Sequence, residues 1–312
     1  MKLTIITINY NNAAGLKLTM ESVFAQTYKD FQYIIIDGAS TDGSVELIES
    51  VKTNYTIVET SRDLSLLSSR DLSLLSESDT GIYNAMNKGI LMAKGEYIHF
   101  LNSGDWLVDE RVVEDMLNEV YSEEVLDKNK LIEQTKESIT ERSRSEGPDI
   151  FVGNVIKVRQ DGKRKYVKHD NTNISLLTFY RGTIQHTSAY IKRSLFDKYG
   201  LYDENLKIVS DWKWYLQVAG LNKADVRFTD RYVSCFDMHG ISSTNLKLDK
   251  AERRQVLEEL IPTPILTDYD THAFDIEQIQ RLKRYPLIYK MMWFFERVLF
   301  KIDKWRGKRG WK

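Results

Sequence analysis

Three short apolar runs in the first third of the chain constrain its fold more than any other feature. Residues 3–8, 31–36 and 97–101 are rich in Ile, Leu, Phe and Tyr, which favour buried strands. Each run ends in a polar loop, and each loop leads into a segment with helical patterning. This order of strand, loop and helix predicts an α/β fold with a parallel sheet.

The polar loops after these strands form a candidate ligand site. Open α/β sheets bind ligands beyond the carboxyl ends of their strands, so the three loops are expected to share one edge. Asp105, in the third loop, is the kind of oxygen ligand that a divalent cation on a nucleotide diphosphate prefers. Alternatively, Asp105 caps a helix at about 107–120. Asp37 either caps a turn or accepts hydrogen bonds from a base or ribose, and no G-x-G-x-x-G motif precedes it.

The composition of the chain is typical of a globular protein. With 312 residues, 42% hydrophobic and 29% charged, the chain is expected to be a globular protein of one large or two modest domains. Cys235 is the only cysteine, which excludes an intramolecular disulfide and fits a reducing compartment. The N-terminus lacks a signal-peptide pattern, and no apolar run approaches roughly 18 residues. A cytoplasmic protein without a spanning helix is therefore expected.

Charge is distributed unevenly along the sequence. Residues 281–312 contain eleven Lys or Arg and two acidic residues, a balance of +9. Because the whole chain carries −1, residues 1–280 carry −10. An acidic body argues against a nucleic-acid partner, and chain ends of opposite charge suggest different partners.

Two stretches of the first half carry no recognisable chemistry. The octapeptide SRDLSLLS occurs twice in succession, at 61–68 and 69–76, and is too short to be a solenoid repeat. We expect this duplication to lengthen a surface loop before Glu77. Residues 121–147 are dense in Glu, Lys, Arg and Ser, which predicts an exposed helical excursion.

A further polar motif follows the repeat. Ser78–Gly81 precedes apolar residues at helical spacing, which predicts a helix over about 80–93. Asp79, at the start of this helix, is either a cap or a contact to a nucleotide. Lys88 is either a solvated charge or a point charge near phosphates.

Four motifs, taken together and in order, resemble one known family. Thr7–Asn11, Asp37–Ser44, Asp79–Gly89 and Phe100–Asp105 are similar to those of family 2 glycosyltransferases, which have a GT-A fold, and the similarity extends over about residues 1–245. The resemblance implies a Rossmann-like GT-A fold, with a mixed, mainly parallel sheet flanked by helices. It implies a nucleotide-sugar donor, usually a UDP-sugar. It also implies a divalent metal, Mn²⁺ or Mg²⁺, and inverting transfer to a hydroxyl group.

The resemblance implies roles for residues of the first half. Those expected around the base, ribose or diphosphate are Thr7, Asn9, Asp37, Asp79 and Lys88. Asp105 would be the metal-binding end of the family's D-x-D element, and Asn102 would lie near the transferred sugar. The element reads Asn-Ser-Gly-Asp here, so only its final carboxylate is present.

Four residues of the second half complete the expected site. The resemblance places His186 beside the donor sugar and acceptor, and Asp211 as the base that removes the acceptor proton. It places His239 as a second metal or diphosphate ligand. Trp212 offers a flat face for stacking on a sugar ring. Each has a structural alternative: a hydrogen-bonded histidine for His186 and His239, a helix cap for Asp211, and a core side chain for Trp212.

The end of the chain predicts a separate amphipathic helix. From Tyr285, apolar residues share a helical stripe that Lys and Arg flank: Ile288, Met291, Met292, Phe295, Leu299 and Ile302. Trp293, Trp305 and Trp311 occupy positions typical of interfacial aromatics. This composition favours a helix lying on a membrane surface. The alternative is a core-packing or dimer helix with a solvated basic tail.

These expectations give a complete hypothesis of organisation and function. The GT-A domain would span 1–245, with a nucleotide-binding half (1–105) and an acceptor-binding half (106–245), followed by a helical connector (246–284) and a membrane-associating segment (285–312). The expected activity is inverting, metal-dependent transfer of a hexosyl or N-acetylhexosaminyl group to a glycan or lipid-linked acceptor for surface polysaccharide. The protein would be peripheral on the inner face of the cytoplasmic membrane.

Two alternative functions remain open from the sequence. A nucleotidyltransferase on a similar sheet usually has a basic, Gly-rich loop near the first strand, and Thr7–Asn12 is neither basic nor Gly-rich. A catalytically degenerate, membrane-docked binding or scaffold protein is favoured only by the reduced metal element and by Ser210, where the family commonly has a second acid.

Overall fold

The computed structural model describes residues 1–50, 71–122, 147–169 and 174–310. The chain divides into two compact units, Met1–Arg254 and Gln255–Lys312. The elements of the first unit, in chain order, are β1 (Leu3–Asn9), α1 (Ala13–Phe24), β2 (Phe31–Asp37), β3 (Asp71–Ser76), α3 (Ile82–Met92), β4 (Tyr97–Phe100), β5 (Trp106–Leu107), α4 (Val112–Val120), β6 (Ile150–Val158), β7 (Arg164–Val167), α6 (Leu176–Arg181), η2 (His186–Ser188), β8 (Ala189–Lys192), α7 (Ser194–Tyr199), α8 (Ser210–Tyr215), η3 (Leu216–Leu221), β9 (Val226–Asp237) and α9 (Ile241–Thr244). Helix α10 (Leu246–Leu260) begins in the first unit and ends in the second, which also contains α11 (Thr263–Lys283) and α12 (Pro286–Gly310).

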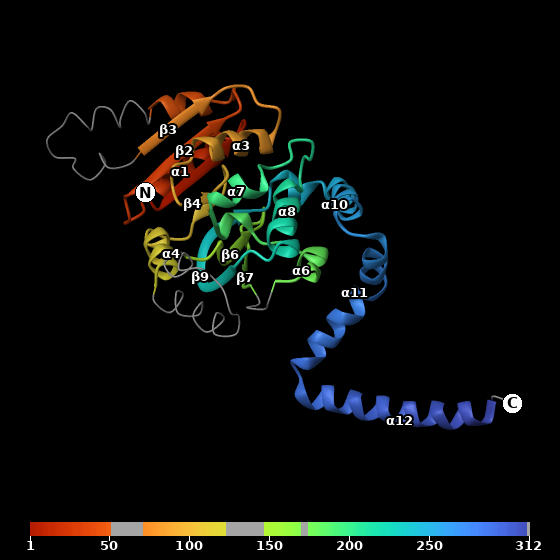
Figure 1. The fold of residues 1–312 in the computed structure, drawn as a ribbon. Coiled ribbons are helices and arrows are strands. Elements are labelled where there is room, and N and C mark those ends of the chain that lie inside the picture. The colour runs from red at the N-terminus through yellow and green to blue at the C-terminus, as the bar shows by residue number, and fades with distance from the viewer. Residues whose placement is uncertain (51–70, 123–146, 170–173, 311–312) are drawn as a thin grey trace, which may run out of the picture. The chain divides into compact units, whose positions relative to one another are not determined.

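The described strands of the first unit form one nine-stranded sheet (Figure 1). Its order is β3-β2-β1-β4-β8-β6-β9-β5, and β7 pairs with β6. The first four strands in this order are parallel neighbours, whereas β8 is antiparallel to both β4 and β6. The predicted mixed, mainly parallel α/β sheet is confirmed, and the loops after β1, β2 and β4 leave the sheet at one edge.

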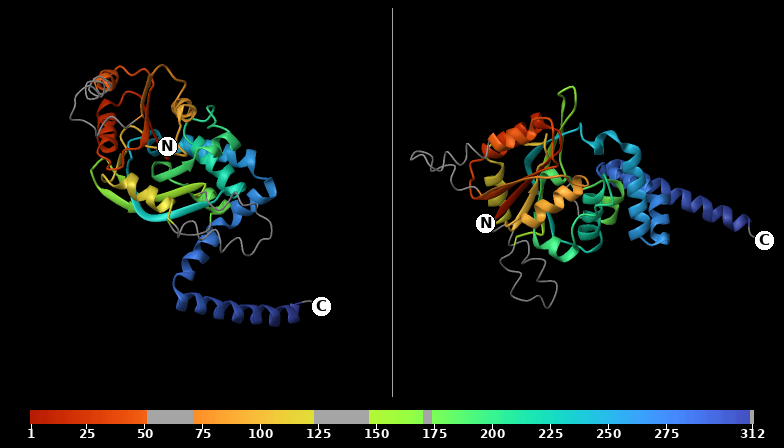
Figure 2. Two further views of the ribbon diagram at one scale, coloured as in Figure 1. Left: turned by 60° about the vertical axis from the view of Figure 1, so that its left-hand side comes forward. Right: turned by 90° about the horizontal axis from the view of Figure 1, so that it is seen from above.

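Helices cover both faces of the first strands because the side chains of β1 alternate between faces. Leu3 and Ile5 belong to a buried cluster with apolar residues of α1 and α4, among them Leu16 and Met116. On the other face, a Cβ atom added to Gly89 of α3 would lie 2.6 Å from Ile6 Cγ2, so glycine lets α3 approach β1 closely. Figure 2 shows α1 and α3 on opposite sides of β1 and β2.

The expected surface loop at the duplicated octapeptide is wrong for the described part of its second copy. Asp71–Ser76 forms β3, which pairs in parallel with β2 and is the outermost of the described strands on that side. Leu72 and Leu74, two residues apart, pack against the buried cluster, as alternate residues of a strand do. This period-two pattern, rather than the repeat length, decides the structure. Residues 61–70, and most of the expected excursion at 121–147, lie outside the described residues.

The helix expected at about 107–120 begins later, at Val112. Trp106 and Leu107 instead form β5, which pairs antiparallel with β9 through Cys235 and Ser234. The β-prone aromatic and apolar pair therefore extends the sheet before the helix starts. This pairing brings the loop that carries Asp105 beside the end of β9.

The second unit contains the predicted C-terminal helical tail. Helix α12 is 25 residues long and exposes large apolar side chains: Leu287, Ile288, Met291, Trp293, Phe294, Phe295, Leu299, Phe300 and Trp305. Among the described residues, no helix has both the length and the apolar character needed to cross a membrane.

Candidate active site

A pocket of about 1140 Å³ lies at the carboxyl ends of β1 and β4. Its wall is formed by the loops after these strands, the start of α3, the segment before η2, the start of α8, the end of β9 and the first half of α10. Small-molecule sites occupy roughly 300–1,000 Å³, so this pocket has room for a large or a second ligand. Most predicted site residues line it: Asn9, Asp79, Asn102, Asp105, His186, Asp211, Trp212 and His239.

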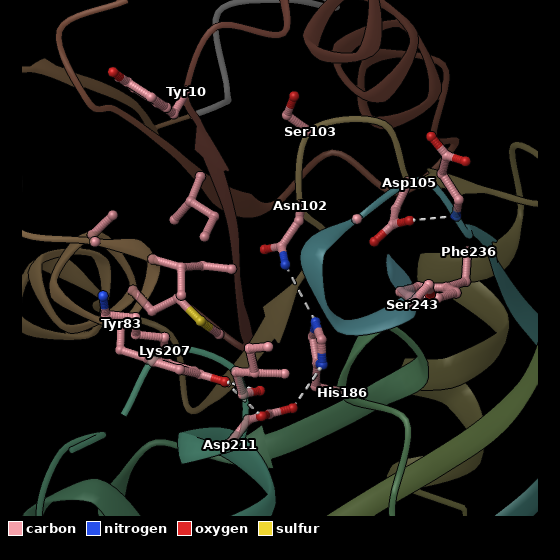
Figure 3. Close-up of a pocket in the computed structure, with 18 of the residues that line it drawn as sticks. Tyr10, Tyr83, Asn102, Ser103, Asp105, His186, Lys207, Asp211, Phe236 and Ser243 are labelled. Carbon is pink, nitrogen blue, oxygen red and sulfur yellow. Dashed lines mark hydrogen bonds and ion pairs between the residues drawn. The ribbon is translucent and has the colours of Figure 1, made fainter. Parts of the chain in front are cut away.

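Asp211 and His186 form the centre of a hydrogen-bonded network in this pocket (Figure 3). Asp211 lies in the first turn of α8, and its Oδ2 is 3.1 Å from His186 Nδ1. The Tyr83 hydroxyl, from α3, is 2.9 Å from Asp211 Oδ1. On the far side of the imidazole ring, His186 Nε2 is 3.3 Å from Asn102 Nδ2. The network therefore links the loop after β4 with α3 and α8.

The electrostatics of this pair favour an ionised Asp211. Burial alone would raise the pKa of Asp211, but the hydrogen bond and charge of His186, together with the Tyr83 hydroxyl, lower it below its ordinary value. Burial alone would lower the pKa of His186, but the hydrogen bond and charge of Asp211 raise it. Only 19% of the His186 side chain and 16% of the Asp211 side chain are exposed. At neutral pH the pocket therefore contains an Asp211 carboxylate, the form that a general base requires.

Asp105 occupies a different part of the pocket, beside the end of β9. Its Oδ1 accepts a 2.8 Å hydrogen bond from the backbone N–H of Asp237. Burial, with a smaller contribution from the charge of Asp237, raises the pKa of Asp105 to about 7. His239, whose side chain is 52% exposed, contacts the Asp237 carboxylate. Two carboxylates and an imidazole are a donor set that suits Mn²⁺ or Mg²⁺. Within the described ranges, however, no three such side chains are already grouped to hold a metal ion.

Asn9 and Asp79 lie at the end of the pocket next to β1. The Asn9 amide donates to Asp37 Oδ1 at 2.7 Å, and the Asn9 Oδ1 atom has no hydrogen-bond partner among the described residues. The Asp79 carboxylate accepts a 3.0 Å hydrogen bond from the backbone N–H of Gly81, just before α3. Both side chains therefore offer acceptor oxygens at the same end of the pocket.

Replacement of Gly38 by Ala is expected to weaken nucleotide binding by about tenfold or more. The added Cβ would lie 2.7 Å from Asp79 Oδ2, so the Asp79 carboxylate must shift from its present position, and a charged hydrogen bond is worth about 1.5–3 kcal/mol. Because the clashing atom is at the end of a side chain that can rotate, the melting temperature of Gly38→Ala is expected to change little. Calorimetric titration of UDP measures the affinity, and unchanged binding would contradict a nucleotide contact by Asp79.

The structure does not place Asp37 on the pocket wall. Its side chain is fully buried and accepts four hydrogen bonds, from the side chains of Asn9, Ser40 and Ser76 and from the backbone N–H of Ser40. These bonds lower the pKa of Asp37 despite its burial. The carboxylate thus joins the ends of β1, β2 and β3, and it orients Asn9, which does line the pocket.

Thr7 and Lys88 are also not among the residues that line the pocket. The buried Thr7 hydroxyl donates to the carbonyl of Leu101 at 2.8 Å, which joins β1 to the end of β4. Lys88 forms a 2.8 Å ion pair with Glu77 and also donates to the carbonyl of Ser78. In this structure Lys88 holds the segment that precedes α3.

Trp212 is a core side chain rather than an open stacking surface. It is 1% exposed, and its indole N–H lies 3.0 Å from the carbonyls of both Phe179 and Gly182. The Arg253 guanidinium lies 4.6 Å from the centre of the Trp212 ring. The ring is therefore enclosed by α6 and α10, and its role is to support the turn that carries Asp211.

Three pocket residues that contact predicted site residues are not singled out by the sequence. Tyr83 lies within the motif at 79–89, but nothing in the sequence indicates that its hydroxyl reaches Asp211. Asp237 is part of the polar turn that carries His239, and its acidic side chain was the available signal. Arg253 lies on a charged helix in which no motif distinguishes one basic residue from another.

Comparison with known proteins identifies the family. The model described as "Glycosyl transferase family 2" matches residues 4–203. An uncharacterized glycosyltransferase of Rickettsia typhi is 24% identical over 252 residues, which are 80% of this chain and 67% of that protein. The UDP-Glc:alpha-D-GlcNAc-diphosphoundecaprenol beta-1,3-glucosyltransferase WfaP of Escherichia coli is 28% identical over 109 residues, which are 35% of this chain and 38% of that protein.

Solved structures share the fold at low sequence identity. S. aureus TarS 1–349 in complex with UDP-GlcNAc is 15% identical, with a TM-score of 0.54 over 84% of this chain and 72% of that one. The mannosyltransferase PcManGT from Pyrobaculum calidifontis, in complex with GDP-Man and Mn²⁺, is 16% identical, with a TM-score of 0.55 over 88% of this chain and 69% of that one. The predicted GT-A fold is confirmed, and the chain belongs to glycosyl transferase family 2.

Proposed function

We propose that this glycosyltransferase moves a hexosyl or N-acetylhexosaminyl group from a UDP-sugar, with inversion, to a hydroxyl of a glycan or lipid-linked acceptor for surface polysaccharide. The observation that supports it best is the shared pocket of Asp105 and the Asp211–His186 pair, at the carboxyl ends of the parallel strands. The names of two similar proteins point the same way. The S. aureus structure contains UDP-GlcNAc, and the E. coli relative is named for glucosyl transfer to a diphosphoundecaprenol-linked sugar.

In the proposed reaction, the donor base and ribose lie near Asn9 and Asp79, and the acceptor hydroxyl approaches Asp211. The Asp211 carboxylate takes the hydroxyl proton while the oxygen attacks the anomeric carbon from the face opposite the diphosphate. The bond between the anomeric carbon and the diphosphate oxygen breaks, the nucleoside diphosphate leaves, and the configuration inverts. His186 and the Tyr83 hydroxyl hold the Asp211 carboxylate in place.

Asp105, with Asp237 and His239 nearby, would hold a divalent cation. The fit rests on the buried Asp105 carboxylate, which a cation would stabilise in its ionised form, and on a donor set of carboxylates and imidazole. When bound, the cation would offset negative charge on the diphosphate.

Calorimetric titration of UDP, GDP, CMP and dTDP into the protein, with and without Mn²⁺, tests the proposed donor class. Metal-dependent binding of UDP alone is the expected result. Binding of a different nucleotide would reassign the donor, and binding of none would contradict the proposed activity and favour the scaffold alternative.

We also propose that the basic tail attaches the protein to an anionic membrane surface. Helix α12 exposes the aromatic side chains of Trp293, Phe294, Phe295 and Phe300, and residues 281–312 carry a balance of +9. Exposed aromatics beside clustered cations are typical of helices that lie at a lipid interface. A peripheral position would bring the enzyme close to a lipid-linked acceptor.

Deletion of 285–312 is expected to abolish flotation with vesicles that contain anionic lipid. In the full chain, the double change Trp293→Ala and Phe294→Ala is expected to reduce the bound fraction by at least about tenfold, because two large apolar side chains no longer enter the interface. Tyr166→Ala, at an exposed aromatic of the first unit, is the matched control. Equal flotation of all four proteins would contradict attachment through the tail.

A further inference from the structure

Helix α10 lies beyond the matched family region, yet its first half borders the pocket. The family match ends at residue 203, whereas Asp249 and Arg253 of α10 line the pocket wall. Glu252, between them, is 7% exposed although it is charged. Burial of a carboxylate costs free energy unless the carboxylate is fully hydrogen-bonded. The hydrogen-bond partners of Glu252 therefore indicate its structural role.

The partners of Glu252 are three consecutive backbone N–H groups. Oε1 accepts from Lys207 at 2.8 Å, and Oε2 accepts from Ile208 at 2.9 Å and from Val209 at 3.3 Å. Val209 immediately precedes α8, whose first turn carries Asp211. Glu252 therefore fixes the backbone directly before the proposed base.

The same backbone segment is held from its other side by Tyr83. The Tyr83 hydroxyl lies 2.5 Å from the carbonyl of Ile208 and 2.9 Å from Asp211 Oδ1. The N–H of Ile208 thus faces Glu252, and its carbonyl faces a side chain that also contacts the Asp211 carboxylate. A shift of this segment would disturb both the backbone of Asp211 and its hydrogen bond to Tyr83.

Arg253, the next residue of α10, contacts Trp212, which follows Asp211 in the chain. The Arg253 guanidinium covers the ring of Trp212, is ion-paired with Asp249 at 3.1 Å, and lies 3.3 Å from the carbonyl of Gly182. Two consecutive residues of α10 therefore contact the chain on both sides of Asp211: Glu252 at residues 207–209 and Arg253 at Trp212.

We propose that Glu252 is a positioning residue for Asp211, through the Lys207–Val209 backbone. This inference rests on the proposed role of Asp211 as the base. Glu252 itself does not line the pocket, and in this proposal it sets the position of the Asp211 carboxylate through the backbone. Its loss is expected to slow the chemical step while the nucleotide still binds, because Asn9 and Asp79 belong to other elements.

Three variants of the full chain test the inference. In Glu252→Gln, one carboxylate oxygen becomes an NH₂ group that faces backbone donors, so kcat is expected to fall on the order of 100-fold, the effect of a displacement near 1 Å. Glu252→Asp retains both oxygens and is expected to recover part of the rate. Glu258→Gln, the same substitution at an exposed position of α10, is the matched control and is expected to leave kcat unchanged.

Two measurements separate positioning from general damage and from failure of the proposed function. Hydrogen–deuterium exchange is expected to rise in the peptide containing Lys207–Val209 of Glu252→Gln, with UDP affinity and exchange elsewhere unchanged. Normal kcat in Glu252→Gln, or a loss of kcat matched by equal losses of UDP affinity and melting temperature, would overturn the inference while wild-type transfer stands. Absence of transfer in the wild type would instead overturn the proposed function, whereas the exchange experiment still reports on the Glu252 contacts.

Discussion

Asp211→Asn is expected to lower kcat by roughly 10²- to 10⁴-fold, the usual contribution of a positioned base, and to leave UDP affinity unchanged. The amide cannot take the acceptor proton. It also presents an NH₂ group in place of one carboxylate oxygen, toward His186 Nδ1 or the Tyr83 hydroxyl. The His186 imidazole then loses the neighbouring negative charge that raises its pKa. The variant therefore removes the base and also weakens the protonation of His186. Single-turnover transfer rates and calorimetric UDP titration separate these effects.

Controls for this variant are available within the same unit. Asp197→Asn removes a carboxylate that is 69% exposed on α7 and pairs only loosely with Arg193, at 3.6 Å. Its kcat is expected to equal that of the wild type. Near wild-type transfer by Asp211→Asn would remove Asp211 from the proposed role, and the imidazole of His186 would become the next candidate for the base.

Asp105→Asn is expected to abolish the metal-dependent part of UDP binding and to reduce transfer by roughly 10²- to 10³-fold, since a bound cation contributes several kcal/mol. The substitution preserves shape, and the Asn oxygen can still accept the hydrogen bond from the Asp237 backbone. Burial raises the pKa of Asp105 to about 7, so its ionised form is unfavourable in the metal-free fold. The melting temperature of metal-free Asp105→Asn is therefore expected to equal or exceed that of the wild type.

For Asp105→Asn, metal-dependent UDP binding is expected to fall while the melting temperature stays equal or rises. A loss of binding caused by general unfolding would instead lower both. A variant that is at least as stable as the wild type but has lost Mn²⁺-dependent UDP binding would support a metal site at Asp105. UDP binding that responds to Mn²⁺ equally in both proteins would contradict it. Asp197→Asn again serves as the control for a carboxylate remote from the pocket.

The sequence predicts the sheet and much of the pocket because those features have local signals. Strand runs followed by polar loops predict where side chains such as Asn102 and Asp105 leave the sheet, and parallel strands bring those loops together. Asp37 follows the same pattern but turns inward, because Asn9, Ser40 and Ser76 satisfy its carboxylate. That outcome depends on three strands being assembled, which no local pattern encodes.

The contacts of α10 could not be predicted from the sequence, for a different reason. Glu252 accepts hydrogen bonds from backbone N–H groups that are 43 to 45 residues earlier in the chain. Nearly every residue has a backbone N–H group, so no residue type in the sequence indicates this contact. Similarly, Leu72 and Leu74 of β3 are spaced as a strand requires, but the octapeptide repeat alone does not indicate that they pack against a sheet. In both cases packing against distant segments, rather than local propensity, decides the structure.

The position of β3 within the repeat has a genetic consequence. Six of the eight residues in the second copy form β3, and the first copy has the same sequence. Loss of eight in-frame codons through replication slippage would leave one intact copy directly before Glu77. The resulting shorter chain would still contain every side chain that β3 places against the buried cluster, so it is expected to keep β3 paired with β2.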